Sequence, residues 1–181
     1  MNDTTGNIEK APKEYSKLAI ILHWLMAFLL IAMLLTGEQT MGNHDARFLP
    51  TVHASLGIIL FVLVSIRLLW RLIRRHPEPI SPDPFNRFLS RFVHMSLYIA
   101  MFLIPLTGWL AYTEHVKRSF GIHPASWFGY KIPLLPDLGI NWHLIHNWGG
   151  KLFLLLILLH ILAGLKHHFV DRDQTLLRIL K

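Results

Sequence analysis

The sequence has no cysteine and few charged residues for a chain of 181 residues. Without cysteine, the chain can form no disulfide, thiolate metal site, iron–sulfur cluster or thioether link to a cofactor. Charged residues make up 16% of the chain, whereas about a quarter is usual in soluble domains. Apolar residues reach 52%, so the composition favours a membrane protein over a soluble one.

The apolar residues are concentrated in four blocks, most of which reach the ~20 residues that cross a bilayer as a helix. The last block is the shortest, but residues 142–150 extend it on one side. We therefore predict an all-α membrane protein, with residues 1–181 as a single domain and a four-helix transmembrane bundle. The helices are expected at about residues 17–37, 51–75, 87–112 and 141–170. No internal repeat is evident.

The net charge of +7 raises the question of a nucleic-acid partner, but the placement of the basic residues argues against one. Lys and Arg gather before the first apolar block, between the second and third, and after the fourth. Cytoplasmic segments of membrane proteins carry such an excess, so both termini and the loop between the second and third helices are predicted to be cytoplasmic. The basic residues around that loop are Arg67, Arg71, Arg74, Arg75, Arg87 and Arg91.

Histidine is abundant, with 12 copies, and several copies lie inside the apolar blocks. His146 and His160 are fourteen residues apart in the last predicted helix. This spacing places them roughly 21 Å apart along the axis and within about 40° of the same face. An ionisable side chain is costly inside a bilayer and marks a functional site there. The last helix is therefore expected to present functional imidazoles at two depths.

The predicted topology sorts the other intramembrane histidines by depth. His53 begins the second helix at the outer side, level with His146, whereas His23 and His94 lie near the inner side, level with His160. Two imidazoles from different helices at one depth can hold the iron of a haem between them. We therefore predict two haems, one at each level.

The residue one turn further along separates the candidate ligands, because residues four apart share a helix face and a porphyrin lying there needs room. Tyr98 follows His94 at this spacing, and its ring would fill the space, so His94 is expected to be a pocket wall. Each other candidate is followed by a small residue: Ala27, Gly57, Gly150 or Gly164. The predicted axial ligands are His23 paired with His160, and His53 paired with His146.

Other interpretations of these histidines stay open at this point. An intramembrane histidine can hydrogen-bond across helices, and small residues are common where membrane helices pack. Imidazoles alone can also bind zinc or copper, which leaves a haem-free metal-binding transporter as an alternative. The histidines in or near loops are expected to be surface residues: His44, His76, His115, His123 and His143.

Several segments carry a family resemblance. They are residues 15–18 with His23-Trp24, residues 52–57 with 67–71, residues 94–98 and residues 160–177. Together they resemble the bacterial cytochrome b561 family, short four-helix dihaem membrane cytochromes, over nearly all of residues 15–180. The resemblance implies b-type haems, each held by two histidines, from the first, second and fourth helices. It therefore implies the same four ligands.

The resemblance also implies a function. One type in the family is a superoxide oxidase, which passes electrons from periplasmic superoxide through both haems to ubiquinone. We therefore expect a multi-pass protein of the bacterial inner membrane, a quinone-linked oxidoreductase that contacts lipid, quinone and a small periplasmic electron donor, and no nucleic acid. His167 and His94 are the candidates for the quinone and proton site. The alternatives are flow from quinol to a periplasmic acceptor, and a membrane-anchor subunit that relays electrons between the quinone pool and a periplasmic redox partner.

Overall fold

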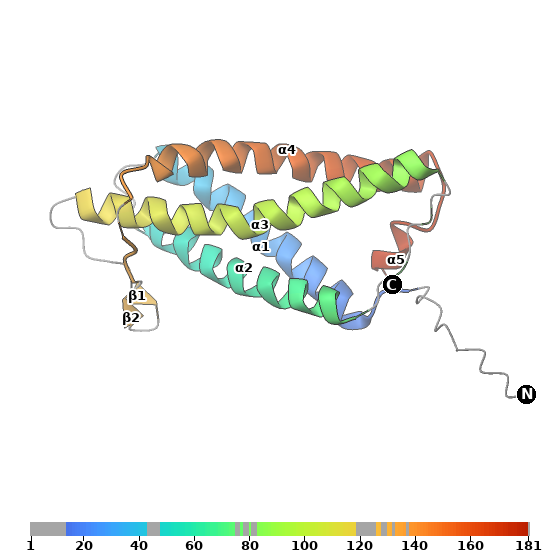
Figure 1. The fold of residues 1–181 in the computed structure, drawn as a ribbon, viewed down its shortest axis with the longest axis horizontal. Coiled ribbons are helices and arrows are strands. Elements are labelled where there is room, and N and C mark those ends of the chain that lie inside the picture. Colours follow the sequence, from blue (N-terminus) through green and yellow to red (C-terminus); the bar gives the residue numbers. More distant parts are fainter. Residues whose placement is uncertain are drawn as a thin grey trace, which may run out of the picture.

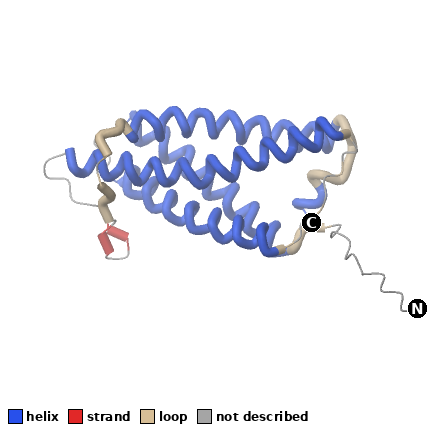
Figure 2. Tube along the Cα trace, viewed as in Figure 1, coloured by secondary structure: helices blue, strands red, loops and turns tan. Residues whose placement is uncertain are grey.

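The computed structural model describes residues 14–42, 48–74, 77, 80, 83–118, 126–127, 130–131, 133–136 and 138–180. Its regular structure is helical apart from one pair of short antiparallel strands, and loops join these elements (Figures 1 and 2). Four of its helices are long and apolar enough to cross a membrane, as the sequence predicts. They are α1 (Lys17–Gly42), α2 (Phe48–Ile73), α3 (Pro84–Arg118) and α4 (Trp142–Phe169). The smaller elements are the paired strands β1 (Ser126–Trp127) and β2 (Tyr130–Lys131), and the helix α5 (Leu177–Leu180).

Large apolar side chains cover the outward surfaces of the long helices. Phe28, Leu72 and Phe169 expose 67%, 74% and 68% of their surface, respectively. Exposure to water would make this surface unfavourable, whereas lipid tails cover it at no such cost. A helix also satisfies its own backbone hydrogen bonds, which the bilayer interior requires. The exposed apolar surface is therefore the surface expected to face lipid.

A small apolar core lies where α1, α2 and α3 meet. Met33 of α1 packs there with Leu60 and Val64 of α2, and Met101 of α3 lies against this cluster. The closest helix packing in the described part of the chain is of α1 with α2, α2 with α3, and α3 with α4 (Figure 1). Leu22, Leu97 and Phe153 are also buried but are not members of this cluster.

The helix α3 begins earlier than the predicted residue 87. The carboxylate of Asp83 accepts hydrogen bonds from the backbone nitrogens of Phe85 at 3.3 Å and Asn86 at 3.1 Å. These bonds cap the first turn, and Pro84 is well suited to the first helical position because its missing N–H is not needed there. The cap therefore extends the helix to Pro84.

The same helix also continues past the predicted residue 112, to Arg118. Thr113 and Glu114 are nearly buried, with 2% and 7% of their surface exposed. The hydroxyl of Thr113 accepts from the backbone nitrogen of Leu135 at 3.2 Å, and the carboxylate of Glu114 accepts from that of Trp142 at 3.1 Å. The helix continues because these contacts tie its last turns to the chain that returns to α4.

The C-terminal segment folds back along the end of the bundle after α4 (Figure 1). Arg172 lies in the turn and has a positive φ of 52°. The indole Nε1 of Trp24 on α1 donates a hydrogen bond to the carbonyl oxygen of Ile179 in α5 at 2.9 Å. The tail is therefore attached to α1 beside His23, at the end of the bundle where α1 begins and α4 ends.

Candidate cofactor site

His53 and His146 face each other across the bundle, from the beginning of α2 and of α4. Their ring centroids are 6.1 Å apart, and the ring planes are inclined at 79°. A metal lies about 2 Å from a ligating imidazole nitrogen, which is itself about 1 Å from its ring centre, so two rings that share a metal have centroids about 6 Å apart. The structure places these two rings at that spacing. We call them the outer pair.

The Nδ1 atom of each outer histidine is bound to the main chain of a neighbouring helix. Nδ1 of His53 lies 3.1 Å from the carbonyl oxygen of Met33 in α1. Nδ1 of His146 lies 3.0 Å from that of Ile104 in α3. A carbonyl oxygen only accepts, so Nδ1 carries the hydrogen in both rings and Nε2 keeps its lone pair. This is the tautomer in which a histidine ligates a metal through Nε2.

Three histidines, His23, His94 and His160, meet nearer the other end of the bundle, where α1 begins and α4 ends, and we call this the inner level. The ring centroid of His160 on α4 is 6.4 Å from that of His23 on α1 and 5.2 Å from that of His94 on α3. The first distance matches two rings that share a metal, whereas the second is too short for it. Nδ1 of His94 lies 2.7 Å from the carbonyl oxygen of Ser90, one turn earlier in its own helix. The geometry therefore favours His23 as the partner of His160.

Arg67 of α2 brings a positive charge to the same level. Its guanidinium donates to the carbonyl oxygen of Ala19 at 2.7 Å and to the hydroxyl of Tyr98 at 3.2 Å. It also acts electrostatically on all three inner histidines. A fixed cation would favour the more electron-rich state of a redox group bound beside it.

Glycines leave room one turn after three of the paired histidines. A Cβ added at Gly150 or Gly164 would meet no atom within 4 Å, and one at Gly57 would meet only the flexible end of Met33, at 3.5 Å. Open space of this kind beside His146 and His160 fits the flat ring of a porphyrin.

A second observation concerns the outer end of α4. Trp142 lies one turn before His146, and residues four apart share a helix face. Its indole Nε1 is buried and has no hydrogen-bond partner in the described structure. Buried donors normally have an acceptor, and a haem propionate carboxylate would supply one. The donor set, the space and this indole therefore fit a haem at the outer pair.

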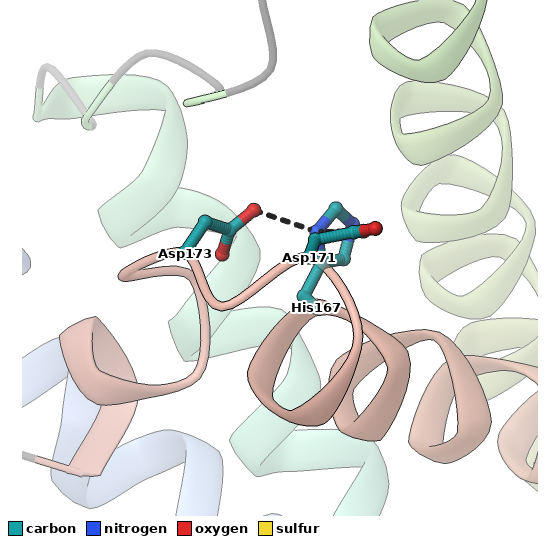
Figure 3. Close-up of side chains that lie close together, drawn as sticks. All are labelled: His167, Asp171 and Asp173. Atoms are coloured by element: carbon teal, nitrogen blue, oxygen red, sulfur yellow. Dashed lines mark hydrogen bonds and ion pairs between the residues drawn. The ribbon is translucent and has the colours of Figure 1, made fainter.

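His167 lies beyond the inner level, near the end of α4, against two carboxylates of the following turn (Figure 3). Its Nδ1 is 2.8 Å from Oδ2 of Asp173 and 3.2 Å from Oδ2 of Asp171. Side chains so placed are able to hold a metal ion, but Lys166 already binds Asp171, at 2.7 Å. Desolvation alone would raise the pKa of Asp173, but hydrogen bonds from Thr175 and His167 outweigh it and lower that pKa below its ordinary value. Asp173 is therefore the carboxylate partner of His167.

The other histidines are not brought to these sites by the described structure. His143 is exposed at the beginning of α4, and the ring of His168 packs against that of Phe169 with centroids 4.8 Å apart. The remaining loop histidines, His44, His76 and His123, lie outside the described residues, as does the side chain of His115.

Thr36 and Thr107 are further members of the outer site that the sequence patterns did not single out. Their hydroxyl oxygens lie 3.2 Å and 3.3 Å from Nδ1 of His53 and His146, respectively. The available signal was the tripeptide Leu-Thr-Gly, which occurs at residues 35–37 and again at residues 106–108. A repeat of three residues is common by chance, so only the structure gives it a meaning.

Four membrane-spanning helices that present facing imidazoles at two levels define a membrane protein suited to hold metal-centred groups between its helices. Comparison with known proteins identifies the family. The family model of prokaryotic cytochrome b561 matches residues 14–181, so the chain belongs to this family. Membership implies b-type haem and an electron-transport function in a multi-pass bacterial membrane protein.

Individual relatives are similar along most of their length. The chain is 34% identical to cytochrome b561 homolog 2 of Escherichia coli, over 93% of this chain and 92% of the relative. It is 29% identical to the probable superoxide oxidase CybB of Yersinia pestis, over 93% and 96%. It is 23% identical to a probable Ni/Fe-hydrogenase B-type cytochrome subunit of Rhizobium leguminosarum, over 86% and 81%.

Proposed function

We propose that this protein transfers single electrons across the bacterial inner membrane, between a small periplasmic donor and ubiquinone. The observation that carries the proposal is the arrangement of the imidazoles. Ring centroids are 6.1 Å apart in the outer pair and 6.4 Å apart between His23 and His160. Two such pairs at different depths supply one redox site toward each membrane surface, as a path across the bilayer requires.

The paired histidines would be the axial ligands of two b haems, His53 with His146 and His23 with His160. Haem b, when bound, supplies the one-electron redox chemistry. The chain contributes the rest. It holds the outer imidazoles with Nε2 available, places the charge of Arg67 at the inner level, and surrounds both levels with apolar helices that exclude water.

We propose a quinone site near His167, at the inner end of α4. Reduction of a quinone needs two protons as well as two electrons. The side chain of His167 is 25% exposed and bound to Asp173 at 2.8 Å, so the pair is able to take a proton from cytoplasmic water and hold it near the bundle. His94 stays the second candidate, at the inner level itself, with its Nδ1 occupied by Ser90.

Superoxide is the donor we propose, because a relative that matches over nearly its full length is named a probable superoxide oxidase. Two superoxide ions would each lose one electron and become two molecules of O₂. One ubiquinone would gain these two electrons and two protons and become ubiquinol. The opposite direction, from quinol to a periplasmic acceptor, requires the same groups.

A second candidate function is a membrane anchor that relays electrons between the quinone pool and a periplasmic redox partner. It is favoured by the similarity to a hydrogenase B-type cytochrome subunit. Both functions require the same two haems. They differ in the need for a partner, so a soluble redox protein that copurifies in fixed proportion would favour the anchor.

The proposal is tested by purifying the protein in detergent, quantifying haem per chain, and recording a reduced-minus-oxidised spectrum. We expect two low-spin b haems per chain, and we expect superoxide to drive formation of ubiquinol by the purified protein alone. A single haem would mean that one histidine pair is wrongly assigned. A colourless protein under adequate haem supply would contradict electron transfer and favour a haem-free metal-binding transporter.

Replacement of Asp173 by asparagine is expected to slow ubiquinone reduction about tenfold while haem content stays unchanged. His167→Gln is expected to slow it about a hundredfold, within the range for loss of an acid–base group. Because the pKa of Asp173 is lowered, its carboxylate is charged at neutral pH, and its contact with His167 is lost only when the pH falls through that lowered pKa. Stopped-flow reduction of a ubiquinone analogue measures the rates.

Asp171→Asn provides a matched control for this prediction. Asp171 also lies near His167, at 3.2 Å, but it is bound to Lys166 at 2.7 Å. We therefore expect a much smaller effect than for Asp173. Equal rates in the two asparagine variants would rule out a specific role for the His167–Asp173 pair.

A further inference from the structure

The outer histidines are held by two matching sets of residues. In α1, the carbonyl oxygen of Met33 and the hydroxyl oxygen of Thr36 lie 3.1 Å and 3.2 Å from Nδ1 of His53. The hydroxyl of Thr36 donates to the carbonyl oxygens of Ala32 at 2.8 Å and Met33 at 3.1 Å. The hydroxyl hydrogen of Thr36 is thus donated within its own helix, and its oxygen is able to accept a hydrogen bond from the Nδ1–H group of His53.

The same arrangement recurs in α3. The carbonyl oxygen of Ile104 and the hydroxyl oxygen of Thr107 lie 3.0 Å and 3.3 Å from Nδ1 of His146. The hydroxyl of Thr107 donates to the carbonyl oxygen of Ile104 at 2.9 Å. In both helices, therefore, Nδ1 of the outer imidazole contacts a carbonyl oxygen and the hydroxyl of a threonine three residues later.

A glycine completes each set. A Cβ added at Gly37 would lie 3.0 Å from Cε1 of His53, and one at Gly108 would lie 2.8 Å from Cε1 of His146. Real Cβ atoms essentially never approach to 2.8 Å and rarely to 3.0 Å, so an alanine at either position would require the imidazole to shift. We call Met33, Thr36 and Gly37, and likewise Ile104, Thr107 and Gly108, the two imidazole cradles.

The two cradles are part of a set of residue spacings that occurs in α1–α2 and again in α3–α4. His23 and His94 each precede a cradle threonine by thirteen residues, and Arg67 and His160 each follow an outer histidine by fourteen. Only scattered positions recur, and the loops between them differ in length, so the recurrence does not form a continuous sequence repeat.

We propose that Thr36 and Thr107 are matched positioning residues that hold both outer imidazoles as Nδ1–H donors, with their Nε2 atoms turned toward one shared metal centre. The inference rests on the proposed function, which assigns the outer pair as ligands. The two threonines act through His53 and His146 rather than by contact with the metal. Such hydrogen bonds orient a ligating histidine and raise its basicity.

The chemistry gives the direction of the effect. An acceptor on Nδ1–H increases the electron density that the ring donates through Nε2, which stabilises the oxidised metal. Loss of the threonine oxygen leaves one acceptor, the carbonyl, at each ring. Thr36→Val and Thr107→Val keep the side-chain shape, so each is expected to raise the midpoint potential of the outer haem, and the double variant is expected to raise it further. Loss of an orienting partner typically weakens metal binding by about 10–100-fold.

The experiment compares purified wild-type protein with the single and double valine variants and with Thr36→Ser and Thr107→Ser. The measurements are the redox titration of both haems, the EPR spectrum of the oxidised protein, and the rate of haem transfer to apomyoglobin. Ser65→Ala is the matched control, because the Ser65 hydroxyl donates to its own helix at Phe61, at 2.8 Å. We expect the valine variants to change only one haem, the serine variants to restore it, and the control to change neither.

Two outcomes overturn the inference while the wild type still binds two haems. One is an unchanged outer-haem potential and EPR spectrum in the double valine variant. The other is a serine variant that behaves like valine, which would point to shape rather than the hydroxyl. Fewer than two haems in the wild type would instead contradict the proposed function. In that case ¹⁵N NMR of the histidine rings decides the inference, since an Nε2–H tautomer at His53 or His146 would overturn it.

Discussion

Replacement of His146 by alanine is expected to reduce the haem content from two per chain to one, and to leave the spectrum of the remaining haem unchanged. His146 supplies one of the two facing rings of the outer pair, 6.1 Å from that of His53. This cysteine-free chain has no thioether link to retain a haem, so the cofactor depends on its two axial bonds. Haem per chain, from the pyridine haemochrome spectrum, measures the effect.

The adjacent turn of α4 offers a matched control for this prediction. His143 is exposed and lies outside the pair, so His143→Ala is expected to retain both haems. His53→Ala is expected to lose the same haem as His146→Ala, and the double variant is expected to lose no more than either single one, because the two residues act as a unit. Two haems in His146→Ala would show that the outer pair is not the ligand pair.

The four long helices and the two levels of histidines along them were predictable because lipid imposes a simple constraint on sequence. A spanning segment must be helical and apolar along about 20 residues, and four such segments are found as expected in the described structure. Helix geometry then fixes how far apart two residues lie and whether they share a face. For His146 and His160 these two quantities already imply two levels within one helix.

The approach of one helix to another was not predictable in the same way. It depends on the side chains at each crossing, which have no fixed period along the sequence. The bonds from His53 to Met33 and from His146 to Ile104 involve backbone carbonyl oxygens, and every residue has one. The extension of α3 to Arg118 likewise depends on a tertiary contact, because Glu114 binds the backbone at Trp142.

The repetition between the two helical hairpins explains why the outer and inner levels differ. At the outer level, equivalent positions of α2 and α4 both carry histidine. At the inner level, the position of α2 equivalent to His160 is Arg67, whose guanidinium is bound to Ala19 and Tyr98. The inner site therefore cannot copy the outer one, and its second proposed ligand comes from α1 or α3 instead. His23 and His94, which occupy equivalent positions, are the two choices.

Substitution of His23 and substitution of His94 are expected to give opposite results. His23→Ala and His160→Ala are each expected to lose the inner haem, so that one haem per chain remains. His94→Ala is expected to retain two. The reason is the spacing of the rings, since the centroid of His160 is 6.4 Å from that of His23 but 5.2 Å from that of His94, and two rings that share a metal need about 6 Å.

His23→Ala and His94→Ala are matched controls for each other. Both remove an imidazole near His160, and both histidines lie within the electrostatic reach of Arg67. A difference in haem content between them therefore reports ligation rather than a general loss of packing or charge. His94→Ala is still expected to shift the inner-haem potential, because it removes a ring 5.2 Å from His160. If His94→Ala loses a haem and His23→Ala keeps both, the ring spacing does not identify the ligand, and α3 rather than α1 supplies it.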